Sequence, residues 1–189
     1  MGVLKVRRKV AYFFLKKSLT FLEIFSIIVL QTRKGDLKME FTKAIYLDMD
    51  GTFVDLYGVD NWLNYLISED SYPYFAAKPL VNLSALARQL NRIQRAGYVI
   101  GVVSWCSRDG SEEYNKQVTE TKRKWLQLHL PSVSWDEIHI VEYGTPKSCV
   151  VDCPCGILFD DEKKNRMEWA KEGFAFDAEN LLSILRHIV

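Results

Sequence analysis

The chain has 189 residues, of which 48% are hydrophobic and 26% are charged, so it can bury a full core and is neither fibrous nor intrinsically disordered. The net charge of +1 hides an asymmetry, because residues 1–38 hold nine Lys and Arg against two acidic residues, a net charge of +7. Residues 39–189 therefore carry −6. Affinity for a phosphate backbone depends on neutralising many charges, so we expect no extended nucleic acid as a partner of this acidic part.

Residues 1–38 form a basic and apolar extension. Its apolar runs, residues 10–15 and 24–30, are separated by two Lys residues and a Glu, so neither approaches the roughly 18 residues of a membrane-spanning helix. A secretory signal would need a continuous apolar core and a small-residue cleavage site, and neither is evident. We therefore predict a cytoplasmic protein in which membrane contact through residues 1–38 is disfavoured.

Met39 is a candidate for a second start site within the chain. Residues 34–36, Lys-Gly-Asp, can be encoded by codons that contain a bacterial ribosome-binding sequence, and Met39 follows at a suitable distance. The favoured interpretation is that the native protein starts at Met39 and that residues 1–38 are translated upstream sequence. Two other interpretations of this extension remain, a basic surface-binding helix and a membrane anchor. Residues 39–189 are predicted to form one domain.

The first predicted strand ends in two carboxylates. The apolar run at residues 44–47 stops abruptly at Asp48, which is followed by Met, Asp50, Gly and Thr. Side chains at positions i and i+2 of an extended chain point the same way, so Asp48 and Asp50 can share one ion and one substrate. Burial of two negative charges this close is costly unless a cation or a catalytic task compensates. The alternative is a strand end with solvated Asp side chains.

Strands and helices alternate along the rest of the chain. Apolar runs predict strands at residues 41–47, 98–104, 137–141, 156–159 and 174–176, and helical periodicity predicts helices at 82–96, 112–130, 162–172 and 180–188. Strands separated by helices indicate an α/β, Rossmann-like, three-layer fold with a parallel sheet and right-handed crossovers. Ligands of such sheets bind beyond the carboxyl ends of the strands. The aromatic-rich segment at about residues 53–81 is too long for a simple loop, and we expect it to form a small helical cap.

The pattern around Asp48 resembles the first signature of the haloacid dehalogenase (HAD) superfamily of phosphohydrolases, Asp-x-Asp-Gly-Thr after a hydrophobic strand. The rest of that family's order follows at suitable intervals: a strand that ends in Ser104, then Lys147, then a strand that ends in Asp160 and Asp161. The resemblance covers roughly residues 39–189 and implies a HAD-like fold.

This resemblance assigns a role to each of these residues. Asp48 is the expected nucleophile, which forms an aspartyl-phosphate, and Asp50 is the expected acid and base. Ser104 would hold phosphoryl oxygens and Lys147 would supply positive charge, although by themselves they read as a strand-end Ser and an ordinary loop Lys. The predicted cofactor is Mg²⁺, which prefers oxygen ligands. The candidate metal ligands are Asp48, Asp50 through its carbonyl, and one of Asp160 and Asp161, with Asp161 favoured.

A closer resemblance concerns residues 122–130 and 158–161, which look like the deoxyribonucleotidase branch of the superfamily. That branch usually has Thr-Ser after the second strand, where this chain has Ser104-Trp105, and its cap is longer. Part of the cap, residues 62–67, follows helical spacing, so some of its rings are expected to be cap core. Aromatic rings above a phosphate site would nevertheless suit a nucleobase. Trp62 and Tyr72 are the rings that we expect to face it.

The cysteines predict no zinc site. Cys149, Cys153 and Cys155 do not have the usual zinc-ligand spacing, and Cys106 is expected at the opposite rim of the sheet from the last two. We expect reduced thiols.

Two function classes remain. The first is a Mg²⁺-dependent phosphomonoesterase that acts on a small phosphorylated metabolite, with nucleoside monophosphates first. The alternative is a non-catalytic or nucleic-acid-end-processing HAD-like module, recruited through the basic N-terminus. A native protein that begins at Met39 would remove the main support for the alternative.

Overall fold

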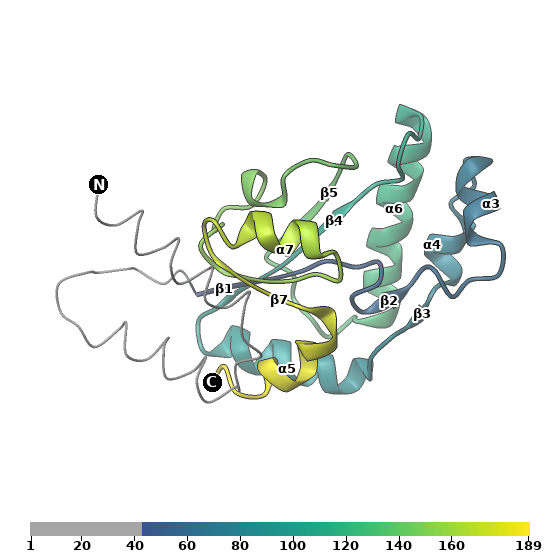
Figure 1. Ribbon diagram of the computed structural model, residues 1–189. Helices are drawn as coiled ribbons and strands as arrows, with labels where there is room; N and C mark the ends of the chain where they lie inside the picture. Colours follow the sequence, from purple (N-terminus) through teal and green to yellow (C-terminus); the bar gives the residue numbers. More distant parts are fainter. Residues whose placement is uncertain (1–42) are drawn as a thin grey trace, which may run out of the picture. The chain divides into compact units, whose positions relative to one another are not determined.

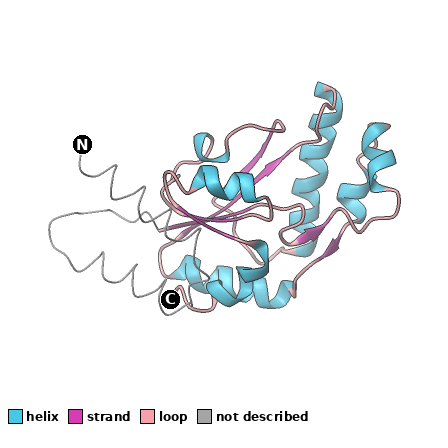
Figure 2. Ribbon diagram, viewed as in Figure 1, coloured by secondary structure: helices cyan, strands magenta, loops and turns pink. Residues whose placement is uncertain are grey.

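The computed structural model describes residues 43–189, so the predictions on residues 1–42, including those on the extension, lie outside the described residues. A five-stranded sheet in the order β5-β4-β1-β6-β7 lies at the centre of this part, and each pairing in it is parallel (Figure 2). Its strands are β1 (Ala44–Leu47), β4 (Val99–Trp105), β5 (Glu137–Val141), β6 (Ile157–Phe159) and β7 (Phe174–Phe176). The predicted Rossmann-like α/β fold with a parallel sheet is confirmed.

Helices cover both faces of the sheet. They are α5 (Leu83–Arg95), α6 (Glu112–His129), α7 (Lys163–Trp169) and α8 (Leu181–Leu185). In β1, Ile45 and Leu47 pack into a core with residues of α5, α6 and α8, whereas Ala44 and Tyr46 pack on the other face with Trp169 of α7. Figure 1 shows α5 and α7 on opposite sides of the sheet. This alternation along one strand is what a strand buried on both faces requires.

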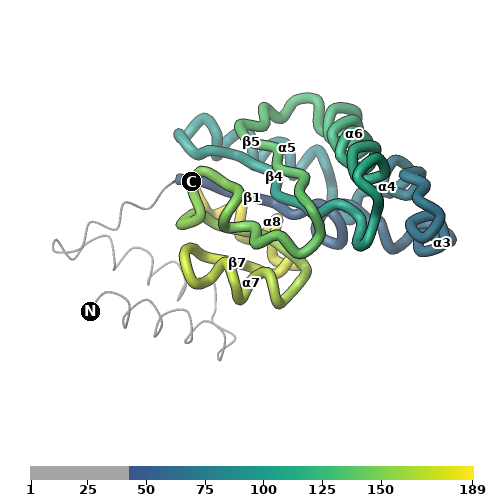
Figure 3. The backbone as a smooth tube through the Cα atoms, turned by 90° about the horizontal axis from the view of Figure 1, so that it is seen from above, coloured from purple at the N-terminus to yellow at the C-terminus, as the bar shows by residue number. Residues whose placement is uncertain are grey.

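The order in which successive strands are added to the sheet reverses at β1. The chain runs from β1 to β4 and β5 on one side and then returns to β6 and β7 on the other, so that β5 and β7 are at opposite edges (Figure 3). The carboxyl ends of β1 and β6 are adjacent, since Leu47 pairs with Phe159. Ligands of parallel α/β sheets bind beyond the strand ends at such a reversal. Asp48 and Asp160 are the first residues beyond these two strands.

The two longest helices begin and end where their sequences predict. The side chain of Asn82 accepts a hydrogen bond from the Ala85 N–H (2.9 Å) and starts α5. Gly97, with φ +87°, follows the end of α5 in a conformation that favours glycine. Ser111 caps α6 in the same way as Asn82 caps α5, by accepting from the Tyr114 N–H (3.2 Å).

The last two helices are shorter than predicted. The predicted helix 162–172 corresponds to α7, which ends at Trp169. It stops there because the chain must turn before β7, where Gly173 lies against the backbone of Gly156. The predicted helix 180–188 is α8 (Leu181–Leu185), preceded by a 3₁₀ turn at Ala178–Asn180 that the Asp177 side chain caps. No helix of the described residues 43–189 is both long enough and apolar enough to cross a membrane.

The segment at residues 53–81, called the cap segment below, contains four short elements. They are β2 (Val54–Asp55), α3 (Trp62–Ile67), α4 (Tyr72–Ala76) and β3 (Lys78–Pro79). The antiparallel pairing of β2 with β3 closes the segment at its base, and sequence periodicity did not predict this pairing. Figure 1 shows α4 beside α6.

Hydrogen bonds fasten the cap segment to α6. The Glu69 carboxylate accepts from the N–H (2.6 Å) and hydroxyl (2.7 Å) of Ser111, and the Trp125 indole donates to the Ala77 carbonyl (2.8 Å). A small separate core joins the two elements, built from Leu56, Tyr74, Tyr114 and Val118. The cap segment is therefore anchored to α6, a helix that also contributes a residue to the candidate active site.

Candidate active site

A tight turn directly after β1 presents the two predicted carboxylates. The Met49 carbonyl accepts backbone hydrogen bonds from residues 52, 53 and 54, and the Gly51 N–H donates to the Val54 carbonyl. None of these bonds uses the Asp50 carbonyl. Gly51 has φ +73°, and a Cβ at this position would collide with the Asp161 carboxylate. Only glycine therefore allows both the turn and the close approach of Asp161.

Lys147 joins the ends of β1 and β6. Its ammonium lies 2.9 Å from Asp48 Oδ1 and 2.6 Å from Asp160 Oδ2. Its side chain is only 3% exposed. Burial by itself lowers the pKa of Lys147, but the negative charges of Asp48 and Asp160 outweigh burial and raise this pKa. Lys147 is thus a buried cation in direct contact with the predicted nucleophile.

Asp160 and Asp161 have different surroundings. Besides Lys147, the Asp160 carboxylate accepts from the Glu162 N–H (2.8 Å) and from the Asn165 amide (3.1 and 3.2 Å). Asp161 lines the cavity described below, and its own N–H donates to the Thr52 hydroxyl (3.2 Å). Protein donors thus occupy both oxygens of Asp160, which leaves Asp161 as the better candidate for an external ligand.

The residues fit a divalent cation. One carboxylate oxygen from each of Asp48, Asp160 and Asp161 lies within 4.8 Å of the other two. Burial and the neighbouring Asp48 charge raise the pKa of Asp160 to about 6 and that of Asp161 to about 7. A bound cation would relieve this repulsion, and hard oxygen donors suit Mg²⁺. Asp48, Asp161 and the Asp50 carbonyl are the groups that could hold it.

A second buried lysine, Lys122 of α6, connects Asp50 to Ser104. Its ammonium donates to Asp50 Oδ2 (2.6 Å), to the Ser104 hydroxyl (3.0 Å) and to the Trp105 carbonyl (2.6 Å). It also lies 5.0 Å from the centre of the Tyr74 ring. Burial raises the pKa of the Asp50 carboxyl, although the Lys122 charge opposes this increase.

No role for Lys122 follows from the sequence motifs, and its signal lies in the helical period instead. Four residues of α6 that share its face are buried: Tyr114, Val118, Trp125 and Leu126. A lysine in the middle of an apolar face needs a buried partner, because an unpaired charge there would be very costly. The helical period of α6 therefore predicts that Lys122 has a buried partner, but it does not identify that partner.

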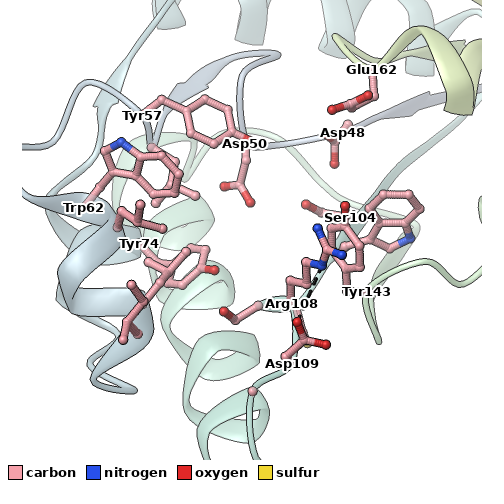
Figure 4. Close-up of a pocket in the computed structure, with 18 of the residues that line it drawn as sticks. Asp48, Asp50, Tyr57, Trp62, Tyr74, Ser104, Arg108, Asp109, Tyr143 and Glu162 are labelled. Atoms are coloured by element: carbon pink, nitrogen blue, oxygen red, sulfur yellow. Dashed lines mark ion pairs between the residues drawn. The ribbon is translucent and has the colours of Figure 1, made fainter.

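A cavity of about 580 Å³ opens above these groups (Figure 4). Its floor contains Asp48, Asp50, Ser104 and Asp161. The cap segment forms one wall, and the loops after β4 and β5 form the other. The cap wall consists of Leu56, Tyr57, Trp62, Leu63, Leu66, Ile67, Glu69 and Tyr74; the opposite wall includes Trp105, Cys106, Ser107, Arg108 and Tyr143. A cavity that combines aromatic and aliphatic wall residues with convergent polar groups on its floor is typical of a small-molecule site.

Paired rings stand on both walls. The Tyr57 and Trp62 rings are 5.1 Å apart on the cap wall, and the Trp105 and Tyr143 rings are 4.8 Å apart on the other. Of the two rings expected to face a ligand, Trp62 lines the cavity and Tyr72 does not. The expectation for Tyr72 is wrong because its ring packs against Tyr65, 5.2 Å away.

The structure therefore brings all six predicted site residues, Asp48, Asp50, Ser104, Lys147, Asp160 and Asp161, to one edge of the sheet. Their chemical roles remain predictions. Cys106 is buried beside this site, and its thiol contacts the Asn115 carbonyl and the Thr119 hydroxyl.

Comparison with known proteins adds little to this geometry. No protein-family model matches the chain, and no curated protein matches it. Among solved structures, it is similar to D,D-heptose 1,7-bisphosphate phosphatase from Burkholderia thailandensis, with 14% identity and a TM-score of 0.43. The match covers 70% of this chain and 74% of that enzyme. At this level of similarity, neither the activity nor the substrate of that enzyme can be transferred to this chain.

Proposed function

We propose that the protein is a Mg²⁺-dependent phosphomonoesterase that works through an aspartyl-phosphate intermediate. The observation that carries this proposal is the pairing of each strand-end carboxylate with its own buried lysine: Asp48 with Lys147, and Asp50 with Lys122. A fixed cation orients a neighbouring carboxylate for attack, and a second carboxyl two residues away can transfer a proton.

In the first half of the reaction, an Asp48 carboxylate oxygen attacks the phosphorus atom. A bond forms between this oxygen and phosphorus while the bond from phosphorus to the leaving oxygen breaks. Asp50 gives its proton to the leaving oxygen, so the alcohol departs neutral. Lys147 offsets the charge of Asp48, and the Ser104 hydroxyl binds a phosphoryl oxygen.

In the second half, Asp50 takes a proton from water, and the resulting hydroxide attacks the phosphorus atom. The bond to Asp48 breaks, which releases phosphate and restores the Asp48 carboxylate. Lys122 holds Asp50 in place during both proton transfers, since its ammonium is also anchored to the Ser104 hydroxyl and the Trp105 carbonyl at the end of β4.

The site would hold Mg²⁺ through Asp48, Asp161 and the Asp50 carbonyl. When bound, Mg²⁺ would offset the negative charge of these groups and of the substrate phosphate. Without a cation, the acidic floor would repel a phosphate dianion, because Asp48, Asp50, Asp161 and Glu162 all line the cavity.

For the substrate, we propose a nucleoside monophosphate. The support is the size of the cavity and the aromatic pairs on its two walls, because aromatic rings are the side chains on which a planar base stacks. Apart from Glu69 and Tyr74, the rest of the cap wall consists of aliphatic side chains, which would accept a base without requiring a particular pattern of hydrogen bonds.

The test is a release assay for inorganic phosphate with and without Mg²⁺. The panel contains nucleoside monophosphates, sugar phosphates and para-nitrophenyl phosphate. We expect Mg²⁺-dependent release, with the highest kcat/KM on nucleotides. Absence of hydrolysis of every ester at saturating Mg²⁺ would reject the proposal.

The same panel addresses the alternative of a nucleic-acid-end-processing module. Oligonucleotides with a 5′- or 3′-terminal phosphate are added as substrates, and the full chain is compared with a chain that starts at Met39. Preference for oligonucleotide ends that depends on residues 1–38 would favour the alternative.

A further inference from the structure

We propose that Trp105 is a positioning residue that holds both buried lysines of the site, Lys122 through its carbonyl and Lys147 through its indole ring. This inference rests on the proposed function, because it concerns how these lysines serve Asp50 and Asp48. Trp105 is the last residue of β4 and directly follows Ser104. It therefore lies between the two pairs of charged groups that would carry the reaction.

The indole ring of Trp105 covers Lys147. The Lys147 ammonium lies 5.1 Å from the centre of this ring, in the range of a cation–π contact. Trp105 lines the cavity, whereas Lys147 does not. The ring thus stands between the cavity and the ammonium. A lysine has a long flexible side chain, so without this ring its ammonium could turn from Asp48 toward water.

The indole also fixes the backbone that carries Lys147. Its N–H donates to the Thr145 carbonyl (2.8 Å), two residues before Lys147. Pro146 lies between them and restricts the chain further. One side chain therefore restrains both ends of Lys147, its backbone and its ammonium.

The other lysine is held by the backbone of the same residue. The Trp105 carbonyl accepts from the Lys122 ammonium (2.6 Å), and this acceptor is a backbone group that a side-chain substitution does not remove. Side-chain variants of Trp105 should therefore disturb Lys147 and spare Lys122. This separation distinguishes positioning from a general loss of packing around the site.

The Trp105 ring has a second neighbour besides Lys147. Tyr143 packs against it, with ring centres 4.8 Å apart, and Arg108 lies 5.5 Å from the centre of the Tyr143 ring. Contacts therefore run in series from the exposed Arg108 through Tyr143 and Trp105 to the buried Lys147. The contact with Tyr143 helps to keep the indole in the orientation that covers Lys147.

The experiment compares Trp105→Phe, which keeps a ring but loses the N–H, with Trp105→Leu, which loses both. The matched control is Trp169→Phe. Trp169 is a buried tryptophan of α7 that does not line the cavity, and its indole also donates to a loop carbonyl, that of Gly156 (3.1 Å). This control removes the same type of hydrogen bond away from the cavity.

Two quantities are measured on the full chain. The first is kcat and KM for para-nitrophenyl phosphate with Mg²⁺. We expect Trp105→Leu to lower kcat by about 10- to 100-fold with KM changed less than about threefold, and Trp105→Phe to fall between it and the wild type. Trp169→Phe should lower the melting temperature while kcat stays within about twofold of the wild type.

The second quantity is the rate at which acetic anhydride labels each lysine, followed by mass spectrometry. Lys147 should react about tenfold faster or more in Trp105→Leu than in the wild type, because its cover is gone, while Lys122 keeps its wild-type rate. Equal protection of Lys147 in both proteins would overturn the inference. So would a kcat of Trp105→Leu within about twofold of the Trp169→Phe value.

These readouts separate this inference from the proposed function. A wild type that hydrolyses no phosphate ester would reject the proposed function, and the labelling of Lys147 against Lys122 would still decide whether Trp105 positions the lysine. A wild type that hydrolyses esters through Asp48, combined with unchanged kcat and labelling in Trp105→Leu, would reject only the role of Trp105.

Discussion

The floor and the cap wall of the cavity are built differently. Beneath the floor, the side chains of Lys122 and Lys147 are 1% and 3% exposed, and each contacts a floor carboxylate at hydrogen-bond distance. On the wall, α3 contains no buried residue, and Ile67 is 72% exposed. Buried charges need fixed partners because desolvation is costly, whereas exposed apolar residues can change with little effect on the fold.

This difference in burial suggests different roles, with the floor carrying out the reaction and the cap wall selecting the substrate. Substitutions on the floor should change turnover of every substrate, whereas substitutions on the cap wall should change the preference among substrates. The variants of floor and wall residues described next test this contrast.

The largest effect is expected for Asp48→Asn. The amide cannot act as the nucleophile, so kcat should fall at least about 10³-fold on every phosphate ester. The measurement is phosphate release at saturating substrate, with circular dichroism to show that the fold is retained. Retained turnover of para-nitrophenyl phosphate by this variant would contradict the mechanism.

The next effect concerns Gly51→Ala. The new Cβ would collide with the Asp161 carboxylate and displace a proposed metal ligand, so kcat/KM should fall by roughly 10²-fold and more Mg²⁺ should be needed for half-maximal activity. The positive φ should also cost about 1 kcal/mol of the free energy of unfolding.

Gly97→Ala is the control for this backbone cost. Gly97 has a similar φ of +87°, but no atom lies within 4 Å of the Cβ position. The two variants should lose similar stability in urea unfolding, while only Gly51→Ala loses activity. Equal activity of the two variants would show that the contact between Gly51 and Asp161 does not matter for function.

On the cap wall, Trp62→Ala should act on selectivity. We expect KM to rise roughly 5- to 150-fold for a nucleoside monophosphate and to change far less for para-nitrophenyl phosphate, because a stacked base loses its partner. Tyr72→Ala is the matched control, since this ring is 49% exposed and outside the cavity. Equal losses on both substrates in Trp62→Ala would reject the nucleotide while leaving the phosphatase proposal intact.

The smallest effect is a shift of melting temperature with pH and Mg²⁺. Burial and the Asp48 charge raise the pKa values of Asp160 and Asp161 to about 6 and about 7. Their contribution to the stability of the metal-free protein is therefore complete below the unfolded pKa of about 4 and is lost as pH rises through 6 to 7.

Mg²⁺ should reverse that loss where the carboxylates are ionised. At about 100 times its dissociation constant it should raise the melting temperature by roughly 5–10 °C near pH 8, and by less than half of that near pH 5. Differential scanning fluorimetry measures both. The same shift at both pH values would contradict a site made of these carboxylates, and Asp161→Asn should remove most of the shift.

Much of the architecture follows from local patterns. The short apolar runs, the helical periods and the caps at Asn82 and Gly97 place nearly every element of the parallel sheet and its helices. The pairing of β2 with β3 could not be predicted in this way, because these strands have two residues each and their periodicity is too short to read. The ends of α7 and α8 were predicted too late, because tertiary turns decide where those helices stop.

The sequence by itself determined that five polar residues at strand ends, Asp48, Asp50, Ser104, Asp160 and Asp161, meet at one edge of the sheet, whereas the loop residue Lys147 was expected there only from the family resemblance. The reason is general: parallel strands place their carboxyl ends together, and a reversal in strand order opens a crevice there. Only the tertiary structure decided how these groups pair, with Lys122 on Asp50, Lys147 between Asp48 and Asp160, and the Trp105 ring over Lys147. Such choices depend on distances between elements far apart in the chain, and packing sets those distances.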